Sequence, residues 1–528
     1  MIKIVHPLKQ VFTKKNLTAV LVSLVLIQPI IDMDWVLYSF LDPLGIPLPS
    51  TVIYFIGMPL VFVLAFLILD KNKKKTLLFG SLYGLSVAIY FVLHHLSTKD
   101  MFDLLYLSNR YIYSITTELR YVLTLIIPFG LIYAFFKAEL KRDVFDRIVL
   151  ISSILISFPL FFGNLFLIGP ATYYNGPTLA NFPTWFMGIY DTFSPKQLAT
   201  KFYFSEGNTT GIILFSLYPL LINAFYKSKK NWVYGVVIFI QGWAMLILGT
   251  RVATYGASLM LATTLGLWIV LALFKVVRFD WRKHLIIASL ALMFFVSLPY
   301  SPAVVNIGID IRNNSAVWDD EYLRQQWKSD LANDPKAQAL VPGTAEFNYY
   351  YQYIFRQYYW LLTLSDAYYK EYYPYVMDAK FYVDYIFNVD FYDRINARQF
   401  ERYFFDYKWE KLNSTQKLLG FGYSRFMMGS ILLEQDFIMQ AYTLGYVGTL
   451  LLTGPWLILL ASVIYKGLRR FKEIWNPDFL TLGLAFVSIL GGAYLSGHVL
   501  DQFFSSTYGA LYIGMLLVYF RKKESINE

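Results

Sequence analysis

Long, uninterrupted apolar runs constrain this chain more than any other feature. A helix of about 20 apolar residues crosses the hydrocarbon core of a bilayer, and we count twelve runs of roughly that length. The runs are continuous rather than alternating, which favours helices over the strands of a membrane barrel. We therefore predict an all-α polytopic membrane protein with about twelve transmembrane helices. We expect them at 17–40, 49–69, 76–96, 119–136, 147–168, 210–226, 231–250, 252–274, 284–300, 437–465, 478–497 and 503–520.

The composition agrees with this class and excludes several kinds of chemistry. Hydrophobic residues make up 57% of the 528 residues and charged residues only 16%, whereas soluble proteins average about 25% charged residues. The absence of cysteine excludes disulfides and thiol catalysis, and the five histidines show no zinc-binding spacing. We therefore expect no metal and no cofactor. The N-terminal apolar run lacks a small-residue cleavage site, so we interpret it as the first span.

The basic residues predict the orientation in the membrane. With twelve spans, seven basic segments all fall on one side, and lysine and arginine favour the cytoplasmic side. Both termini are then cytoplasmic, and the net charge of +10 reflects topology, so no nucleic-acid partner is expected. The segments are the N-terminal tail with Lys3, Lys9, Lys14 and Lys15, then 70–75, 137–142, 227–230, 275–283, 466–472 and 521–523.

The long connections fall on the other side, at 97–118, 169–209 and 301–436. The last has 14 lysines and arginines against 18 acidic residues and is too long for a simple loop. We expect three parts: helices 1–9 in residues 1–300, a mostly helical extracellular subdomain at 301–436, and helices 10–12 in 437–528.

The extracellular subdomain has helix-like stretches at 319–332 and 395–412 and many tyrosines, as in Tyr349–Tyr351 and Tyr358–Trp360. The simpler interpretation is that these rings pack the core of the subdomain and lie at the membrane interface. The alternative is that they stack on sugar rings.

Arg251 stands between two apolar runs with almost no loop, on the predicted outer side. A guanidinium is always charged and is well matched to a diphosphate. The positive-inside bias makes an arginine in a tight outer turn unexpected. We therefore expect Arg251 to clamp a diphosphate; the alternative is an interfacial arginine that reaches lipid headgroups.

Other outer polar residues are candidate substrate contacts. Arg120, with Arg110 nearby, either converges on the same anion or pairs with Glu118. Asn208 either only caps the sixth span or also contacts sugar or phosphate, and Lys201 supplies a further cation.

Three more candidates lie near the C-terminal spans. Glu434 and Asp436 stand where the external segment meets the tenth span, and either serves as a general base or complements a helix dipole. Arg425 ends the stretch Gly420-Phe-Gly-Tyr-Ser-Arg425. His498 and Asp501 form either an assisting pair or a structural one.

These segments resemble the O-antigen ligase and polymerase family, bacterial enzymes that use undecaprenyl-diphosphate-linked glycans. Gly249-Thr-Arg-Val-Ala253 resembles the family's arginine between small residues, and Glu206-Gly-Asn208 is similar to its asparagine-containing segment before the sixth span. Gly420-Phe-Gly422 through Gly445-Tyr-Val-Gly448 is similar to a glycine pair, a polar dyad and a Gly-Leu-x-Gly sequence. The twelve-span plan, with its largest outer loop between spans nine and ten, also matches.

The polar dyad of this chain differs from that of one branch of the family. Lipopolysaccharide ligases usually carry His-Asn at the dyad, where this chain has Glu434 and Gln435. The Glu-x-Asp version is more similar to polymerase-type members of Gram-positive bacteria, including teichuronic-acid-type polymerases.

The resemblance implies a glycosyltransferase-C-like, inverting, metal-independent enzyme of cell-surface polysaccharide synthesis. It implies a catalytic role for Arg251, Glu434 and Asp436. The expected partners are an undecaprenyl-diphosphate-linked glycan donor, a glycan or wall-polymer acceptor, and membrane lipids. The substrate-binding residues are then Arg120, Lys201, Asn208, Arg425 and His498.

Two alternatives remain from the sequence. A flippase or transporter of lipid-linked sugars needs the same cations and spans, but often shows repeated halves, and we find no repeat. A transferase that uses a polyprenyl monophosphate sugar typically has acidic residues in its first outer loop, where 41–49 holds only Asp42.

Overall fold

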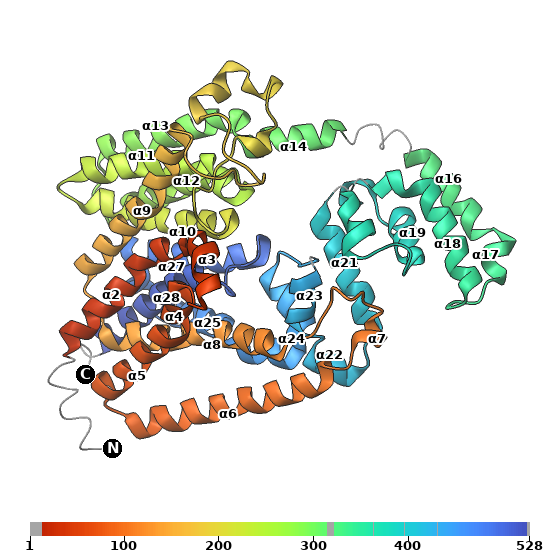
Figure 1. Cartoon of the computed structure of the whole chain (residues 1–528). Helices are drawn as coiled ribbons and strands as arrows, with labels where there is room; N and C mark the ends of the chain where they lie inside the picture. The colour runs from red at the N-terminus through yellow and green to blue at the C-terminus, as the bar shows by residue number, and fades with distance from the viewer. Residues whose placement is uncertain (1–12, 314–320, 363, 395, 430, 525–528) are drawn as a thin grey trace. The chain divides into compact units, whose positions relative to one another are not determined.

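The computed structural model describes residues 13–313, 321–362, 364–394, 396–429 and 431–524 (Figure 1). In these ranges the regular secondary structure is helical, with only isolated bridges such as Pro170 to Pro177. This confirms the prediction of an all-α polytopic membrane protein. Lys3 and Lys9 of the predicted basic tail lie outside the described residues.

Ten helical segments in the described ranges are long and apolar enough to cross a membrane. Two more apolar elements complete the predicted set: α11 (Asn231–Ile247) is shorter, and α24 (Asp436–Leu452) and α25 (Gly454–Arg469) form a pair bent by 41°. Each of the twelve predicted runs is therefore helical over most of its length. The ten are α2 (Lys14–Ile31), α4–α5 (Pro49–Leu69), α6 (Lys73–Thr98), α8 (Ile115–Ala138), α9 (Arg142–Leu165), α10 (Gly207–Lys227), α12 (Arg251–Leu273), α13–α14 (Trp281–Ile309), α27 (Pro477–Leu495) and α28 (Phe503–Glu524).

The first predicted span, 17–40, is wrong at its C-terminal end. Helix α2 ends at Ile31, and short helical turns follow from Asp34 to Leu44. The connection to the second span therefore carries Asp32 and Asp34 besides Asp42. The scarcity of acids in the first loop thus no longer argues against a monophosphate-sugar transferase.

The chain forms two compact units. The first contains Met1–Tyr83, Val122–Asn306 and Gly454–Glu528, and the second contains Gly84–Tyr121 and Ile307–Thr453. The second unit is larger than the predicted subdomain because it also includes the end of α6, the start of α8, and α24.

The core of the first unit is built around α10, which packs against α9, α11, α12, α27 and α28 (Figure 1). Within its most apolar 18-residue stretch, 94% of the residues are buried. Small residues allow this close packing: a Cβ on Gly211 would lie 2.9 Å from Thr250 Oγ1 and 3.0 Å from Ala253 Cβ. The start of α10 therefore lies directly against the start of α12.

Helix α6 contrasts with α10. It has 26 residues, of which only Val87, Tyr90, His94 and Thr98 are buried. These four recur every three or four residues and form one face of the C-terminal half. Most apolar residues in the rest of the helix are exposed, as expected where lipid surrounds a span.

The second unit is mostly helical, which agrees with the sequence prediction. Tyr373, Tyr382 and Tyr385 are fully buried, whereas Tyr349 and Tyr353 are exposed. Packing of the subdomain core is therefore one role of the tyrosines. The α-helices that lie wholly within it are α7 (Phe102–Leu105), α16 (Glu321–Ala332), α17 (Pro335–Ala339), α18 (Ala345–Tyr358), α19 (Ala379–Asn388), α20 (Phe391–Arg394), α21 (Ala397–Glu410), α22 (Ser414–Leu419), α23 (Tyr423–Gly429) and α24.

Two glycines far apart in the sequence touch within the second unit. Gly420 has φ 81° and Gly445, which interrupts α24, has φ 68°. A Cβ on Gly445 would lie 2.5 Å from Leu418 O and would also collide with the backbone nitrogen of Gly420. The kink exposes backbone carbonyls, and one of them, Leu444 O, accepts a hydrogen bond of 2.6 Å from Tyr90 Oη.

We expect Gly445→Ala to destabilise the protein severely, because the added Cβ combines a left-handed backbone with a backbone collision. Gly343→Ala is the matched control, since Gly343 has φ 88° but no atom within 4 Å of its added Cβ. The control variant should lose only the stability that corresponds to backbone strain, about 1–2 kcal/mol. Thermal unfolding of both variants in detergent measures the difference, and equal melting temperatures would contradict the packing argument.

Candidate functional site

Arg251 is the first residue of α12, and a very short turn places it there. Gly249 takes φ 71°, which a glycine adopts without strain. Thr250 is the N-cap, and its Oγ1 accepts a hydrogen bond of 3.3 Å from Ala253 N. Local sequence chemistry therefore fixes the direction of the chain at Arg251.

The segment between α9 and α10 covers the end of α11. Thr200 N donates to Ile247 O at 3.0 Å, and Thr172 Oγ1 donates to Leu248 O at 2.9 Å. The last carbonyls of a helix lack partners within the helix, so these bonds stabilise the turn that leads to Arg251.

The N-termini of α10 and α12 lie side by side. A Cβ on Gly207, the first residue of α10, would lie 3.3 Å from Thr250 Cγ2 at the cap of α12. The N-cap of α10 is Glu206, and its side chain makes no capping bond. The prediction that Asn208 caps this helix is therefore wrong, because Asn208 is its second residue. Two helix N-termini with their positive dipole ends meet here, an arrangement that favours an anion.

The side chain of Arg251 is exposed, and it makes no hydrogen bond or ion pair with any residue that the structure describes. A cation at the N-terminus of a helix opposes the dipole, and the matching effect of a favourable charge is about 0.3–1 kcal/mol. The position is therefore unfavourable for Arg251 unless an anion binds there.

Lys201 lies in a segment that is hydrogen-bonded to the residues after α2. Its Nζ donates to Ser205 O at 2.7 Å. Asp32 accepts two hydrogen bonds from Ser205, from N at 2.9 Å and from Oγ at 2.7 Å. Trp35 Nε1 donates to Tyr203 O at 2.7 Å. The residues after α2 thus fix the segment that carries Lys201 into α10.

The environment of Asp32 and Lys201 changes their protonation. Burial raises the pKa of Asp32 to about 6, although the hydrogen bonds from Ser205 favour its charged form. Burial lowers the pKa of Lys201, while the charges of Glu206 and Asp32 oppose that change. Asp32 therefore titrates near neutral pH beside the start of α10.

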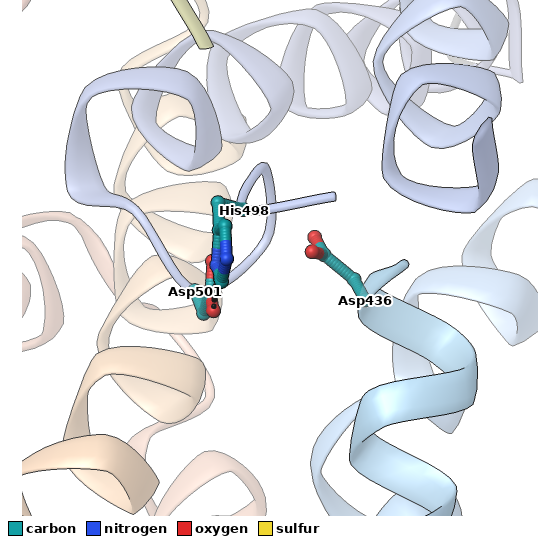
Figure 2. A group of neighbouring side chains, drawn as sticks. All are labelled: Asp436, His498 and Asp501. Carbon is teal, nitrogen blue, oxygen red and sulfur yellow. Dashed lines mark hydrogen bonds and ion pairs between the residues drawn. The ribbon is translucent and has the colours of Figure 1, made fainter. Parts of the chain in front are cut away.

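His498 lies in the turn before α28, within reach of the same helix end. Its carbonyl accepts a hydrogen bond of 2.8 Å from Thr209 Oγ1 in the first turn of α10. Its imidazole Nδ1 lies 3.1 Å from Asp501 Oδ2, and Figure 2 shows the two side chains beside each other. Gln502 Nε2 donates to Glu206 Oε1 at 3.4 Å. The His498–Asp501 pair therefore exists and is linked to the start of α10.

The two predicted carboxylates in the second unit have different surroundings. Glu434 is about half-buried and forms an ion pair with Arg398, whose Nε lies 3.1 Å from Glu434 Oε2. Asp436 is the first residue of α24 and is buried (Figure 2). Its position at a helix N-terminus suits a negative charge.

Glu118 and Arg425 are both buried in the second unit. Glu118 Oε1 accepts hydrogen bonds from Ser424, 2.8 Å from N and 2.7 Å from Oγ, and its Oε2 lies 3.4 Å from His94 Nε2. Arg425 donates to backbone carbonyls, including Thr98 O at 2.6 Å. These contacts join the ends of α6 and α8 to α23.

The structure brings four of the eight predicted site residues together in the first unit, around the N-terminus of α10. They are Lys201, Asn208, Arg251 and His498. The other four lie in the second unit: Arg120, exposed on α8, and Arg425, Glu434 and Asp436.

Sequence reasoning missed Asp32 and His94. Asp32 is recognisable in the sequence as a charge that interrupts the first apolar run, but the predicted span 17–40 includes it. His94 gave none, because its partners are remote in sequence.

The fold and this site define a multi-span membrane protein with an anion-favouring centre at paired helix ends. A model of the family of O-antigen ligase like membrane proteins matches residues 14–523. The chain therefore belongs to this family. A comparison with curated proteins gives no match.

We expect the stability of Asp32→Asn relative to wild type to improve as the pH rises from about 5 to about 7.5. Because the folded pKa of Asp32 is raised, the folded protein holds the proton more tightly than the unfolded chain, and ionisation costs stability as the pH rises through about 6. Asparagine does not ionise. Thermal melts across this range measure the difference. A constant difference between Asp32→Asn and wild type would contradict the prediction.

Proposed function

We propose that the protein is a membrane glycosyltransferase that polymerises or ligates undecaprenyl-diphosphate-linked oligosaccharides. The observation that carries this proposal is Arg251, a cation without a partner among the described residues, at the joined N-termini of α10 and α12. Family membership supports the reaction class. The predicted cytoplasmic position of the basic segments and of both termini supports a site on the outer face of the cell membrane.

The donor's diphosphate is the proposed anion. Arg251 offers a planar fork of donors to phosphate oxygens, the helix N-termini offer backbone N–H groups, and Lys201 is a further candidate cation. When an acceptor hydroxyl attacks the anomeric carbon, the bond to the diphosphate breaks and negative charge grows on the leaving group. Fixed positive charge at this place stabilises that transition state without a metal.

The proton of the acceptor hydroxyl needs a base. Attack from the face opposite to the diphosphate inverts the anomeric configuration, and the hydroxyl proton passes to a carboxylate. Glu434 and Asp436 are the candidates in the second unit. Glu434 forms an ion pair with Arg398, and Asp436 is buried at a helix N-terminus.

A flippase would bind the same donor without breaking a bond. The two functions differ in one assay: purified protein in detergent is mixed with lipid-linked oligosaccharide extracted from cells. Longer or transferred glycans support the enzyme, whereas unchanged glycans with movement across vesicles support the flippase.

We expect Arg251→Ala to reduce the transfer rate by about 10²–10³-fold, the usual effect of removing one transition-state donor. Arg251→Lys should recover part of the rate, since it keeps the charge but loses the fork. Arg278→Ala, a change of an exposed arginine, is the control and should transfer normally. Near-normal transfer by well-folded Arg251→Ala would contradict the diphosphate assignment.

We expect one of Glu434→Gln and Asp436→Asn to lose about 10²–10⁴-fold in transfer rate, because a general base contributes that much. The variant that lacks the base should also lose the acidic limb of the pH–rate profile. The other variant should keep that limb. If both variants retain it, neither carboxylate is the base.

A further inference from the structure

The segment between α6 and α8 forms a pocket within the second unit. The pocket has a volume of about 430 Å³, which is within the range of small-molecule sites. The segment is well anchored, because Met101, Leu105, Leu107 and Tyr111 are buried. The pocket is lined by Lys99, Phe102, Asn109, Tyr111, Ile112, Tyr113 and Arg425.

Arg425 fastens both ends of this segment. Its guanidinium donates to Thr98 O at 2.6 Å and Lys99 O at 3.0 Å at one end, and to Tyr111 O at 3.3 Å at the other. Tyr111 Oη in turn donates to Tyr372 O at 3.0 Å. The walls of the pocket are therefore set by buried hydrogen bonds and not by a free loop.

The lining combines aromatic rings with hydrogen-bonding groups. Phe102 and Tyr113 contribute ring surface, and Asn109 and Lys99 contribute an amide and an ammonium group. Arg425 Nε is buried without a hydrogen-bond partner, and an unsatisfied buried donor is costly. This chemistry suits a ligand that has an apolar C–H face and many acceptor oxygens.

A sugar ring has both properties. Its C–H face packs on aromatic rings, and its hydroxyls accept from amide and ammonium donors. Acids balance the two cations: Asp100 Oδ2 lies 3.9 Å from Lys99 Nζ, and the charge of Glu118 acts on Arg425. The pocket therefore does not require an anion, unlike the site at Arg251.

We propose that this pocket is a glycan subsite that binds one sugar unit of the oligosaccharide, apart from the bond that reacts. The inference rests on the proposed function for the identity of the glycan. A contact on the sugars restricts the orientations in which a bound oligosaccharide reacts. Such a subsite acts on binding and leaves the chemical step unchanged.

The test fills the pocket. Ile112 lines it and is 62% exposed, so Ile112→Trp occupies space without disturbing a core. Leu104→Trp is the matched control, because Leu104 lies on the same segment, is 37% exposed and does not line the pocket. Asn109→Ala is a second variant that removes an amide and cannot cause overpacking.

The probe is the oligosaccharide released by mild acid from the lipid-linked pool of the expressing cells, so it carries no diphosphate. Calorimetry on full-length protein in detergent should show binding to wild type and to Leu104→Trp. Ile112→Trp and Asn109→Ala should bind about tenfold more weakly. No binding to wild type, or equal binding to all four proteins, would overturn the subsite.

A transfer assay separates this result from the proposed function. With lipid-linked donor, Ile112→Trp should raise KM while kcat stays within about twofold of wild type. Binding of the released oligosaccharide without any transfer by wild type would overturn the glycosyltransferase and leave a glycan-binding site. Transfer with an unchanged KM in Ile112→Trp would retain the enzyme and overturn the subsite.

Discussion

The charge of Arg251 at the positive end of a helix is the constraint around which the proposed site of the first unit is arranged. Nothing in the described residues neutralises it, yet the surroundings hold it firmly. Gly249 supplies the turn, Thr250 the cap, and Thr172 and Thr200 cover the carbonyls behind it. These contacts hold the charge in a fixed place, which supports the proposed anion site.

The close contact between α10 and α12 also supports the proposed anion site. Glycines at 207 and 211 are needed because any larger side chain would push the two helix ends apart. The helix ends then act together, since dipole effects fall off within the first turn. Backbone packing is thus as important to the proposed anion site as the side chains that line it.

Much of the fold follows from the sequence because a bilayer permits so few structures. Apolar runs of sufficient length must be helices, and all twelve predicted runs contain one. The first was extended too far because an apolar count does not detect that Asp32 binds Ser205, a residue 173 positions away. Local rules also failed at Asn208, where tertiary contacts start the helix one residue after Glu206.

Part of the candidate site was predictable because polar residues stand out beside apolar runs. Arg251 and His498 were recognised as polar residues beside apolar runs. The burial of Arg425 could not be recognised from the sequence, since the carbonyls that accept its hydrogen bonds are more than 300 positions away. The glycine pattern that resembled a family acquires a physical cause, because Gly420 and Gly445 meet backbone to backbone.

Helix α6 has a consequence for the membrane itself. Its 26 residues extend about 39 Å at 1.5 Å per residue, longer than a hydrocarbon core of about 30 Å. The helix must tilt or project, and its N-terminal half has no buried residue that would hold it to the protein. Its C-terminal half carries His94, which lies against Glu118. Lipid composition is therefore part of the protein's structural environment.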